Sequence, residues 1–318
     1  MDTGEIPNKP KLLQTIQRWR AKLSPIAAII IIGIFIYWAW KYRGIIASSF
    51  EIVGIIHLTL LVLLIGVSLI LSVFTFTILV RDKGYTFSFS DGYHALNLSQ
   101  LASMVPGKIW GFAGLAGLLW SKGISKLDSV VIILLNTLIM LSACAIVGFT
   151  GIAAVAGWRY AIICLLPFLF LVVGRGQLEN LRLKYIPGSS SLPSTRALVK
   201  VLLLGVIVWL IVSSSFTWFI YLSQGGKVVP FWIATGAYAA SYLGGFISLL
   251  APSGIGVSEG LVALILAPYL GTEKVIAIAV SFRIVHTCVI WCNILLTLIL
   301  NSTKTKRDKI DLENRSSS

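Results

Sequence analysis

The chain has 318 residues, of which 57% are hydrophobic and 12% are charged, and its formal net charge is +14. A soluble domain carries about 25% charged residues, and several apolar stretches here exceed the ~18 residues that identify a membrane-spanning candidate. The composition therefore excludes a soluble domain and predicts an all-α polytopic membrane protein. The basic residues lie in loops and tails between apolar stretches, which indicates membrane topology and anionic lipid contact rather than nucleic-acid binding.

Residues 1–25 form a basic tail in which four apolar residues recur at helical spacing. This pattern fits either a short helix lying on the cytoplasmic membrane surface or a solvated tail. The apolar stretch that follows ends in aromatic residues, without the small residues of a signal-peptide cleavage site. We therefore expect a retained membrane anchor.

Apolar stretches then follow one another from residue 26 to residue 300, which we expect to form a single membrane domain before a polar cytoplasmic tail at 301–318. The stretches are 26–40, 52–80, 93–105, 109–120, 130–156, 160–174, 198–222, 231–251, 258–270 and 275–300.

Two proline–glycine breaks interrupt this apolar sequence. A broken helix in lipid leaves backbone groups unpaired at several kcal/mol each, so it persists only where protein or a water-filled cavity covers it. Each break is either a kink in a full span or the tip of a re-entrant hairpin. The first break contains Pro106, Gly107 and Lys108, and the second contains Pro252, Ser253, Gly254 and Gly256.

The distribution of positive charge distinguishes these two topologies. With both breaks as hairpins and the N-terminus in the cytoplasm, 19 Lys and Arg residues lie inside and 5 outside. With both breaks as kinks, the loop at 175–200 moves outside and the counts become 14 and 10. The positive-inside rule therefore favours six spans plus two hairpins, with both termini in the cytoplasm.

The two breaks also correspond to each other along the chain. A shift of 146 residues superposes Pro106 on Pro252 and aligns the order of the spans, which gives half-repeats of about 26–156 and 158–300. Because three spans separate the hairpins, they enter from opposite faces. An inverted repeat with breaks near the midplane is typical of transporters.

The hairpin tips contain groups suited to an anion. The helix that begins at Ile109, directly after Lys108, would point its positive N-terminal end toward the midplane. Gly254 and Gly256 allow the second tip to fold its backbone into an anion-binding nest. These features predict a site for an anionic ligand such as a lipid phosphate.

Ionisable residues inside the apolar sequence are the other candidates for this site. Glu259 lies one turn into the arm after the second break, and Arg283 lies in the last span with His286 at i+3. With Lys108 these groups sum to a net charge of +1. In the alternative interpretation, Glu259 and Arg283 form a buried pair that fixes the fold, and Lys108 reaches to the membrane interface.

Asn97 and Gln100 lie at i,i+3 on the first hairpin arm, where they either line the same cavity or join the helices by hydrogen bonds. We expect no metal site, because the four cysteines lie in apolar segments without enough neighbouring ligands and are interpreted as small buried apolar residues. The cysteines are Cys144, Cys164, Cys288 and Cys292.

The two break motifs, together with Arg283, resemble the lysylphosphatidylglycerol synthase transmembrane region, also called the flippase-like domain. The resemblance extends from about residue 26 to residue 300. It implies a bacterial or archaeal inner-membrane protein related to the lipid-translocating half of the multiple peptide resistance factor. The chain differs from the family at Leu135-Asn136-Thr137, where a charged residue is expected, and only a polar tail follows Leu300, so lysine transfer to lipid is not expected.

We therefore expect a translocase for a lipid or polyprenyl lipid with a phosphate headgroup, with no cofactor and no enzymatic activity. One alternative is a non-transporting membrane partner of a glycolipid or cell-envelope biosynthesis enzyme. A lipid phosphatase of the type 2 phosphatidic acid phosphatase family is the weaker alternative. Its Pro-Ser-Gly motif requires a following histidine, and that position is Ile255 here.

Overall fold

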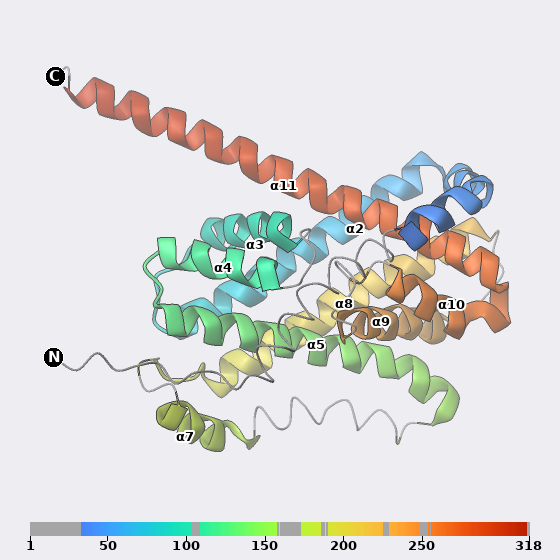
Figure 1. The fold of residues 1–318 in the computed structure, drawn as a ribbon, viewed down its shortest axis with the longest axis horizontal. Coiled ribbons are helices and arrows are strands. Elements are labelled where there is room, and N and C mark those ends of the chain that lie inside the picture. Colours follow the sequence, from blue (N-terminus) through green and yellow to red (C-terminus); the bar gives the residue numbers. More distant parts are fainter. Residues whose placement is uncertain are drawn as a thin grey trace, which may run out of the picture.

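The computed structural model describes residues 33–103, 109–157, 159, 173–185, 188, 190–224, 229–247, 254 and 256–316. Every regular element among them is a helix, and four helices are long and apolar enough to cross a membrane. These four are α2 (Arg43–Asp82), the part of α5 at Lys126–Gly151, α8 (Thr195–Ser223) and the part of α11 at Thr272–Leu300. The prediction of an all-α polytopic membrane protein is confirmed (Figure 1).

The other helices are shorter. The first hairpin consists of α3 (Phe89–Ser103) and α4 (Ile109–Ser121), and the second consists of α9 (Phe231–Ile247) and α10 (Val257–Leu270). The complete long helices are α5 (Lys126–Ala156) and α11 (Thr272–Ser316), and α7 (Arg175–Tyr185) is a short polar helix. Residues 33–41 are also helical, whereas most of the predicted span 160–174 lies outside the described residues.

Two boundaries differ from the sequence-based prediction. The second predicted span begins earlier, at Arg43, because its helix continues across a break at Gly54, whose φ of 72° only glycine adopts readily. The last helix does not end with its apolar sequence at Leu300 but continues through the polar tail to Ser316. Polar sequence is compatible with this extension, since a helix in water satisfies its own backbone hydrogen bonds.

The first hairpin begins and ends on the same side of the bundle. Asp91, in the first turn of α3, forms an ion pair of 2.5 Å with Lys122, which directly follows α4. Helices α3 and α4 therefore pack as a hairpin and do not continue each other as one kinked span. Capping reinforces this end of the molecule, because the Ser125 hydroxyl accepts the Asp128 backbone N–H at the start of α5.

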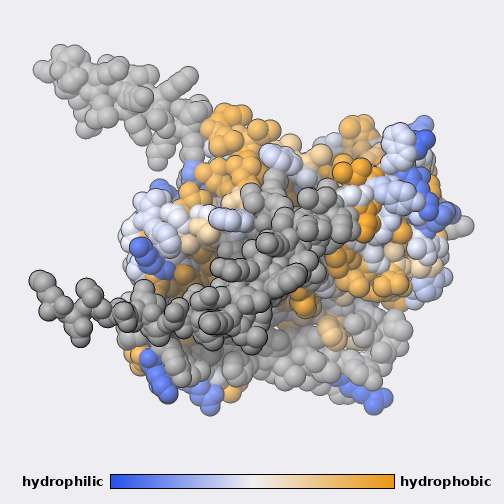
Figure 2. Space-filling model, in the orientation of Figure 1, coloured by the Kyte–Doolittle hydropathy of each residue, from blue (hydrophilic) through white to orange (hydrophobic). Residues whose placement is uncertain are grey.

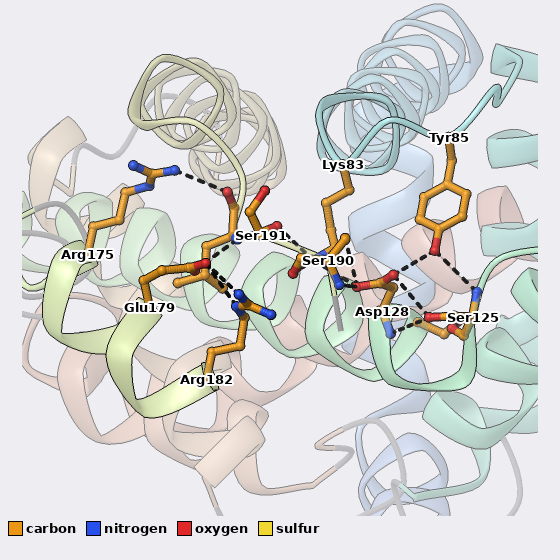
Figure 3. Close-up of polar contacts among 11 residues, drawn as sticks. Lys83, Tyr85, Ser125, Asp128, Arg175, Glu179, Arg182, Ser190 and Ser191 are labelled. Carbon is orange, nitrogen blue, oxygen red and sulfur yellow. Dashed lines mark hydrogen bonds and ion pairs between the residues drawn. The ribbon is translucent and has the colours of Figure 1, made fainter. Parts of the chain in front are cut away.

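A buried polar network joins three loops at this end (Figure 3). The Lys83 ammonium lies 3.0 Å from the Asp128 carboxylate and donates to the backbone carbonyls of Ser190 and Ser191. Asp128 also accepts the Tyr85 hydroxyl and both the backbone N–H and the hydroxyl of Ser190. We call this end of the bundle the Lys83 end. Residues 190–194 lie here, beside the end of α2 and the start of α5, as the hairpin topology requires.

A second group of contacts holds α7 to the same loop. Arg175 donates to the backbone carbonyls of Leu192 and Pro193, and Glu179 accepts from Arg182 and from the Leu192 backbone N–H. In Figure 3, α7 and the Lys83 network lie on either side of Ser190 and Ser191. Loop 190–194 is thereby fixed between α7, the end of α2 and the start of α5.

The apolar core has two parts, one toward each end of the bundle. At the Lys83 end, α3, α4, the end of α2 and the start of α8 share a buried cluster that includes Leu79, Leu119 and Val201. At the opposite end, which we call the Thr272 end, the start of α2, the end of α8, α10 and the start of α11 share a cluster that includes Ile46 and Val275. The two hairpins therefore enter the bundle from opposite ends.

Large apolar side chains cover the outer surfaces of the candidate spans. Ile55, Leu134 and Leu203 are 77%, 60% and 59% exposed, respectively. Apolar residues occupy much of the visible surface of the described part in Figure 2, and hydrophilic residues gather toward its edges. Such a surface suits a bilayer, whose hydrocarbon removes these side chains from water.

Candidate functional site

Arg283 and Glu259 form a buried ion pair between α11 and α10. The Arg283 Nε donates to Glu259 Oε1 at 2.7 Å, and its Nη2 donates to the Ser258 hydroxyl at 2.8 Å. The Arg283 side chain is 12% exposed and that of Glu259 is 4% exposed. This short contact agrees with the alternative interpretation of the sequence, in which Glu259 and Arg283 form a buried pair. A role of the two residues in binding stays a prediction.

The backbone at the second break positions Glu259. Gly256 has a φ of 82° and lies at the N-terminal cap of α10, where its backbone N–H donates to Glu259 Oε2 at 2.6 Å. The carboxylate thus meets the helix N-terminus, which favours negative charge, and the guanidinium. Both oxygens of Glu259 are bound, and the site contains its own anion.

Close backbone packing holds this tip against α9. Gly254 has a φ of 72°, and a β-carbon there would lie 3.2 Å from the backbone carbon of Gly245 in α9. The Ser258 hydroxyl donates to the Gly254 carbonyl at 2.7 Å. Pro252 and Ser253, which the sequence analysis also assigns to the site, lie outside the described residues.

A cavity of about 10 Å³ lies beside the ion pair, between α9, α10 and α11. Such a space holds about one water molecule and no phosphate group. Its walls include three hydroxyl-bearing residues of α9, which are Tyr238, Ser241 and Tyr242.

An aromatic cluster lies beside this cavity, whose wall includes Tyr238. The rings of Phe216 and Tyr238 stack with centroids 4.8 Å apart, and Phe282 lies 5.3 Å from each of them. A separate apolar cavity of about 580 Å³ lies between α2, α8 and α9.

The predicted polar residues of the first hairpin lie elsewhere. The Asn97 amide donates to the Thr297 hydroxyl at 3.1 Å, and the Tyr93 hydroxyl donates to Asn293 at 2.8 Å, so both bonds join α3 to α11. The Gln100 carbonyl accepts the Ser103 hydroxyl within α3. Pro106, Gly107 and Lys108 lie outside the described residues.

The remaining residues that the sequence singles out are His286 and the four cysteines. His286 lies one turn beyond Arg283 on α11 and is half-buried. Of the cysteines, Cys144 is buried as predicted and Cys164 lies outside the described residues. Cys288 and Cys292 are exposed on the outer face of α11, so their predicted burial within the protein is wrong. Within the described ranges, no three His, Cys, Asp or Glu side chains are grouped for metal binding.

Sequence reasoning missed three contributors to the site. Ser258 belongs to the second break motif, and its position directly before Glu259 was the available signal. Tyr238 and Tyr242 lie at i,i+4 on one face of α9, which points toward the ion pair. Their role depends on the packing of α9 against α10, which the sequence of α9 does not specify.

Comparison with known proteins agrees with this architecture. No curated protein matches the chain. A family model described as "Lysylphosphatidylglycerol synthase TM region" matches residues 12–292, which include both hairpins, Glu259 and Arg283. The chain therefore belongs to the lysylphosphatidylglycerol synthase transmembrane-region family.

Proposed function

We propose that the protein is a translocase that moves a lipid with an anionic phosphate headgroup, either a phospholipid or a polyprenyl phosphate, between the two leaflets of a cell membrane. The observation that carries the proposal is the Arg283–Glu259 pair at the broken helix between α9 and α10. A charged group inside a span is costly and is found mostly where substrates pass. The lipid-related family supports a membrane-lipid role.

The site supplies donors of the kind that a phosphate needs. The Arg283 guanidinium offers a planar fork of N–H groups, and the Ser258 hydroxyl and the N-terminal end of α10 lie beside it. We include Lys108, at the tip of the first hairpin, as a second cation for the headgroup. The proposal requires no bond cleavage, and we assign transport rather than catalysis.

The entry of the hairpins from opposite ends supports alternating access. In this proposal the half-chains 26–156 and 158–300 form an inverted repeat, and the hairpin tips meet near the midplane. The acyl or prenyl tails stay in the bilayer while the headgroup passes the tips. The Lys83 end faces the cytoplasm, in agreement with the distribution of basic residues.

The test is a flipping assay in reconstituted vesicles of phosphatidylcholine and phosphatidylglycerol containing a headgroup-accessible fluorescent phosphatidylglycerol. We expect Arg283→Ala and Lys108→Ala to abolish protein-dependent flipping, because each removes a cation that neutralises the phosphate. Lys274→Ala, an exposed cation at the start of the same helix as Arg283, is the matched control and should flip normally.

Unchanged flipping in both site variants would remove the site assignment. If the wild-type protein flips no anionic lipid, including a polyprenyl phosphate probe, the translocase proposal fails. A non-transporting partner of an envelope-biosynthesis enzyme would then explain the membrane domain better.

A further inference from the structure

The site already contains an anion, and that anion belongs to the protein. One oxygen of Glu259 accepts a hydrogen bond from the Arg283 guanidinium, and the other accepts one from the Gly256 backbone N–H. The carboxylate therefore occupies the donors that a bound phosphate would use. The side chain is 4% exposed, and the adjoining cavity holds about one water molecule.

A phosphate that reaches Arg283 competes with Glu259 for the same donors. Even with Lys108 beside the headgroup, as proposed above, the phosphate and the Glu259 carboxylate then both face the one Arg283 guanidinium in a region with little water. Two close like charges in such a place are costly, and protonation of one of them removes the cost. The phosphodiester of a phospholipid is a much stronger acid than a carboxyl group, so with a phospholipid the proton goes to Glu259.

We infer that Glu259 takes up one proton when the lipid phosphate binds Arg283 and releases it when the phosphate leaves, so that lipid movement is coupled to proton movement. The inference rests on the proposed function and adds the coupling ion. The proton comes from water on the side from which the lipid enters, and it converts the carboxylate to a neutral acid. When the phosphate departs, the proton leaves to water and Arg283 again donates to the carboxylate.

The other titratable groups around Glu259 come from the two helices packed on α10. Arg283 and His286 lie on α11, and Tyr238 and Tyr242 lie on α9. Arginine stays protonated at every physiological pH, and tyrosine stays neutral near pH 7. An imidazole is the other side-chain group here that can bind a proton, so the experiment must separate His286 from Glu259.

The test measures proton uptake on binding of dioctanoyl-phosphatidylglycerol, whose phosphodiester does not titrate near pH 7. Isothermal titration of the full chain in detergent, in two buffers of different ionisation enthalpy, gives the number of protons bound per lipid. We expect about one proton per lipid for the wild type, because Glu259 changes from carboxylate to acid. Glu259→Gln should bind the lipid with no proton uptake, since its amide carries no charge to neutralise.

Two controls assign the proton. His286→Gln should keep the uptake of the wild type, and so should Glu273→Gln, which removes an exposed carboxylate from the first turn of α11. A second measurement uses only the wild type, so it still tests the protonation of Glu259 if a variant does not fold. Infrared difference spectra should show a carbonyl band of a protonated carboxylic acid when the lipid is added, and its shift in D₂O distinguishes this band from the ester carbonyls of the lipid.

The outcomes separate this inference from the proposed function. Binding by the wild type with no proton uptake and no new carbonyl band would overturn the coupling and leave the translocase intact. Uptake that persists in Glu259→Gln, or that is lost in His286→Gln, would overturn the assignment to Glu259. Absence of both binding and flipping for every anionic lipid would overturn the translocase and the coupling together.

Discussion

Lys83 and Asp128 form an ion pair of 3.0 Å in which the two side chains are 0% and 4% exposed. Lys83 follows α2, and Asp128 lies in the first turn of α5, so the pair joins two candidate spans across the first hairpin. Backbone groups of Ser190 complete it from a third segment. This arrangement fixes which loops share a side of the membrane.

The topology is directly testable with single cysteines in a cysteine-free background. We expect Lys126→Cys and Ser191→Cys to react with a membrane-impermeant thiol reagent from one side of the membrane, because both exposed positions lie at the Lys83 end. Lys274→Cys, at the Thr272 end, should react only from the other side. Labelling of positions 126 and 191 from opposite sides would contradict the hairpin topology.

Loss of one partner from the Lys83–Asp128 pair should destabilise the protein strongly. Lys83→Met leaves the Asp128 carboxylate buried without its cation, and such a change costs about 3–5 kcal/mol. Thermal unfolding in detergent, followed by circular dichroism, measures the effect. Lys122→Met removes a more exposed partner, from the pair with Asp91, and should cost about 0–1 kcal/mol. Equal losses in the two variants would show that burial does not set the strength of the Lys83 pair.

Arg283→Lys tests whether the site needs a guanidinium or only a positive charge. Arginine donates to Glu259 and Ser258 through different nitrogens, whereas the lysine ammonium is a single point donor. Loss of one charged hydrogen bond costs about 1.5–3 kcal/mol, which corresponds to about 10- to 100-fold weaker lipid binding. Titration with dioctanoyl-phosphatidylglycerol measures it, and wild-type affinity in Arg283→Lys would exclude recognition by the planar fork.

Gly236→Ala tests the contact between α5 and α9. A β-carbon at Gly236 would lie 2.5 Å from the Cα of Gly151, and backbone atoms cannot withdraw as a flexible side chain can. We expect a loss of about 1–3 kcal/mol in stability from overpacking. Gly117→Ala is the control, because a β-carbon there has no neighbour within 4 Å and alanine favours the helix. A neutral Gly236→Ala would mean that the two helices separate easily.

Acid should loosen loop 190–194 through Glu179. Partial burial raises the pKa of Glu179, but hydrogen bonds from Arg182 and the Leu192 backbone N–H outweigh it and hold the pKa below its usual value. A carboxyl with a depressed folded pKa stabilises the fold above its unfolded pKa and loses that contribution as the pH falls. The protection factor of the Leu192 amide, which compares its exchange with the intrinsic rate at the same pH, should therefore fall at acidic pH. In Glu179→Gln this protection factor should be low already at pH 7.

Much of the fold follows from local sequence. The breaks at Pro106 and Pro252 and the distribution of basic residues predict two hairpins, and the described helices on either side of each break pack against each other in pairs, α3 with α4 and α9 with α10. Hydropathy also locates the candidate spans, because burial in lipid depends on composition alone. The bend at Gly54 was not predicted, since a single glycine in an apolar run also fits a straight helix.

The candidate site is only partly predictable for a different reason. Glu259 and Arg283 are identifiable because charge is rare in apolar sequence. Their contact with Ser258 and their closeness to Tyr238 depend on how α9, α10 and α11 cross. The bond from Asn97 to Thr297 joins residues 200 positions apart, and the sequence of either helix alone fits several partners.

The glycine contact between α5 and α9 has a consequence for how the chain is built. The second hairpin rests on a helix of the first half through Gly151 and Gly236, and the first hairpin is fastened to the last helix through Asn97 and Thr297. Each hairpin is thus anchored to both halves of the chain, since α9 also packs on α8 and α3 also packs on α2. Neither half made alone would contain all the contacts that hold its hairpin. A chain severed between the halves would form the contacts between them only when both pieces are present in the same membrane.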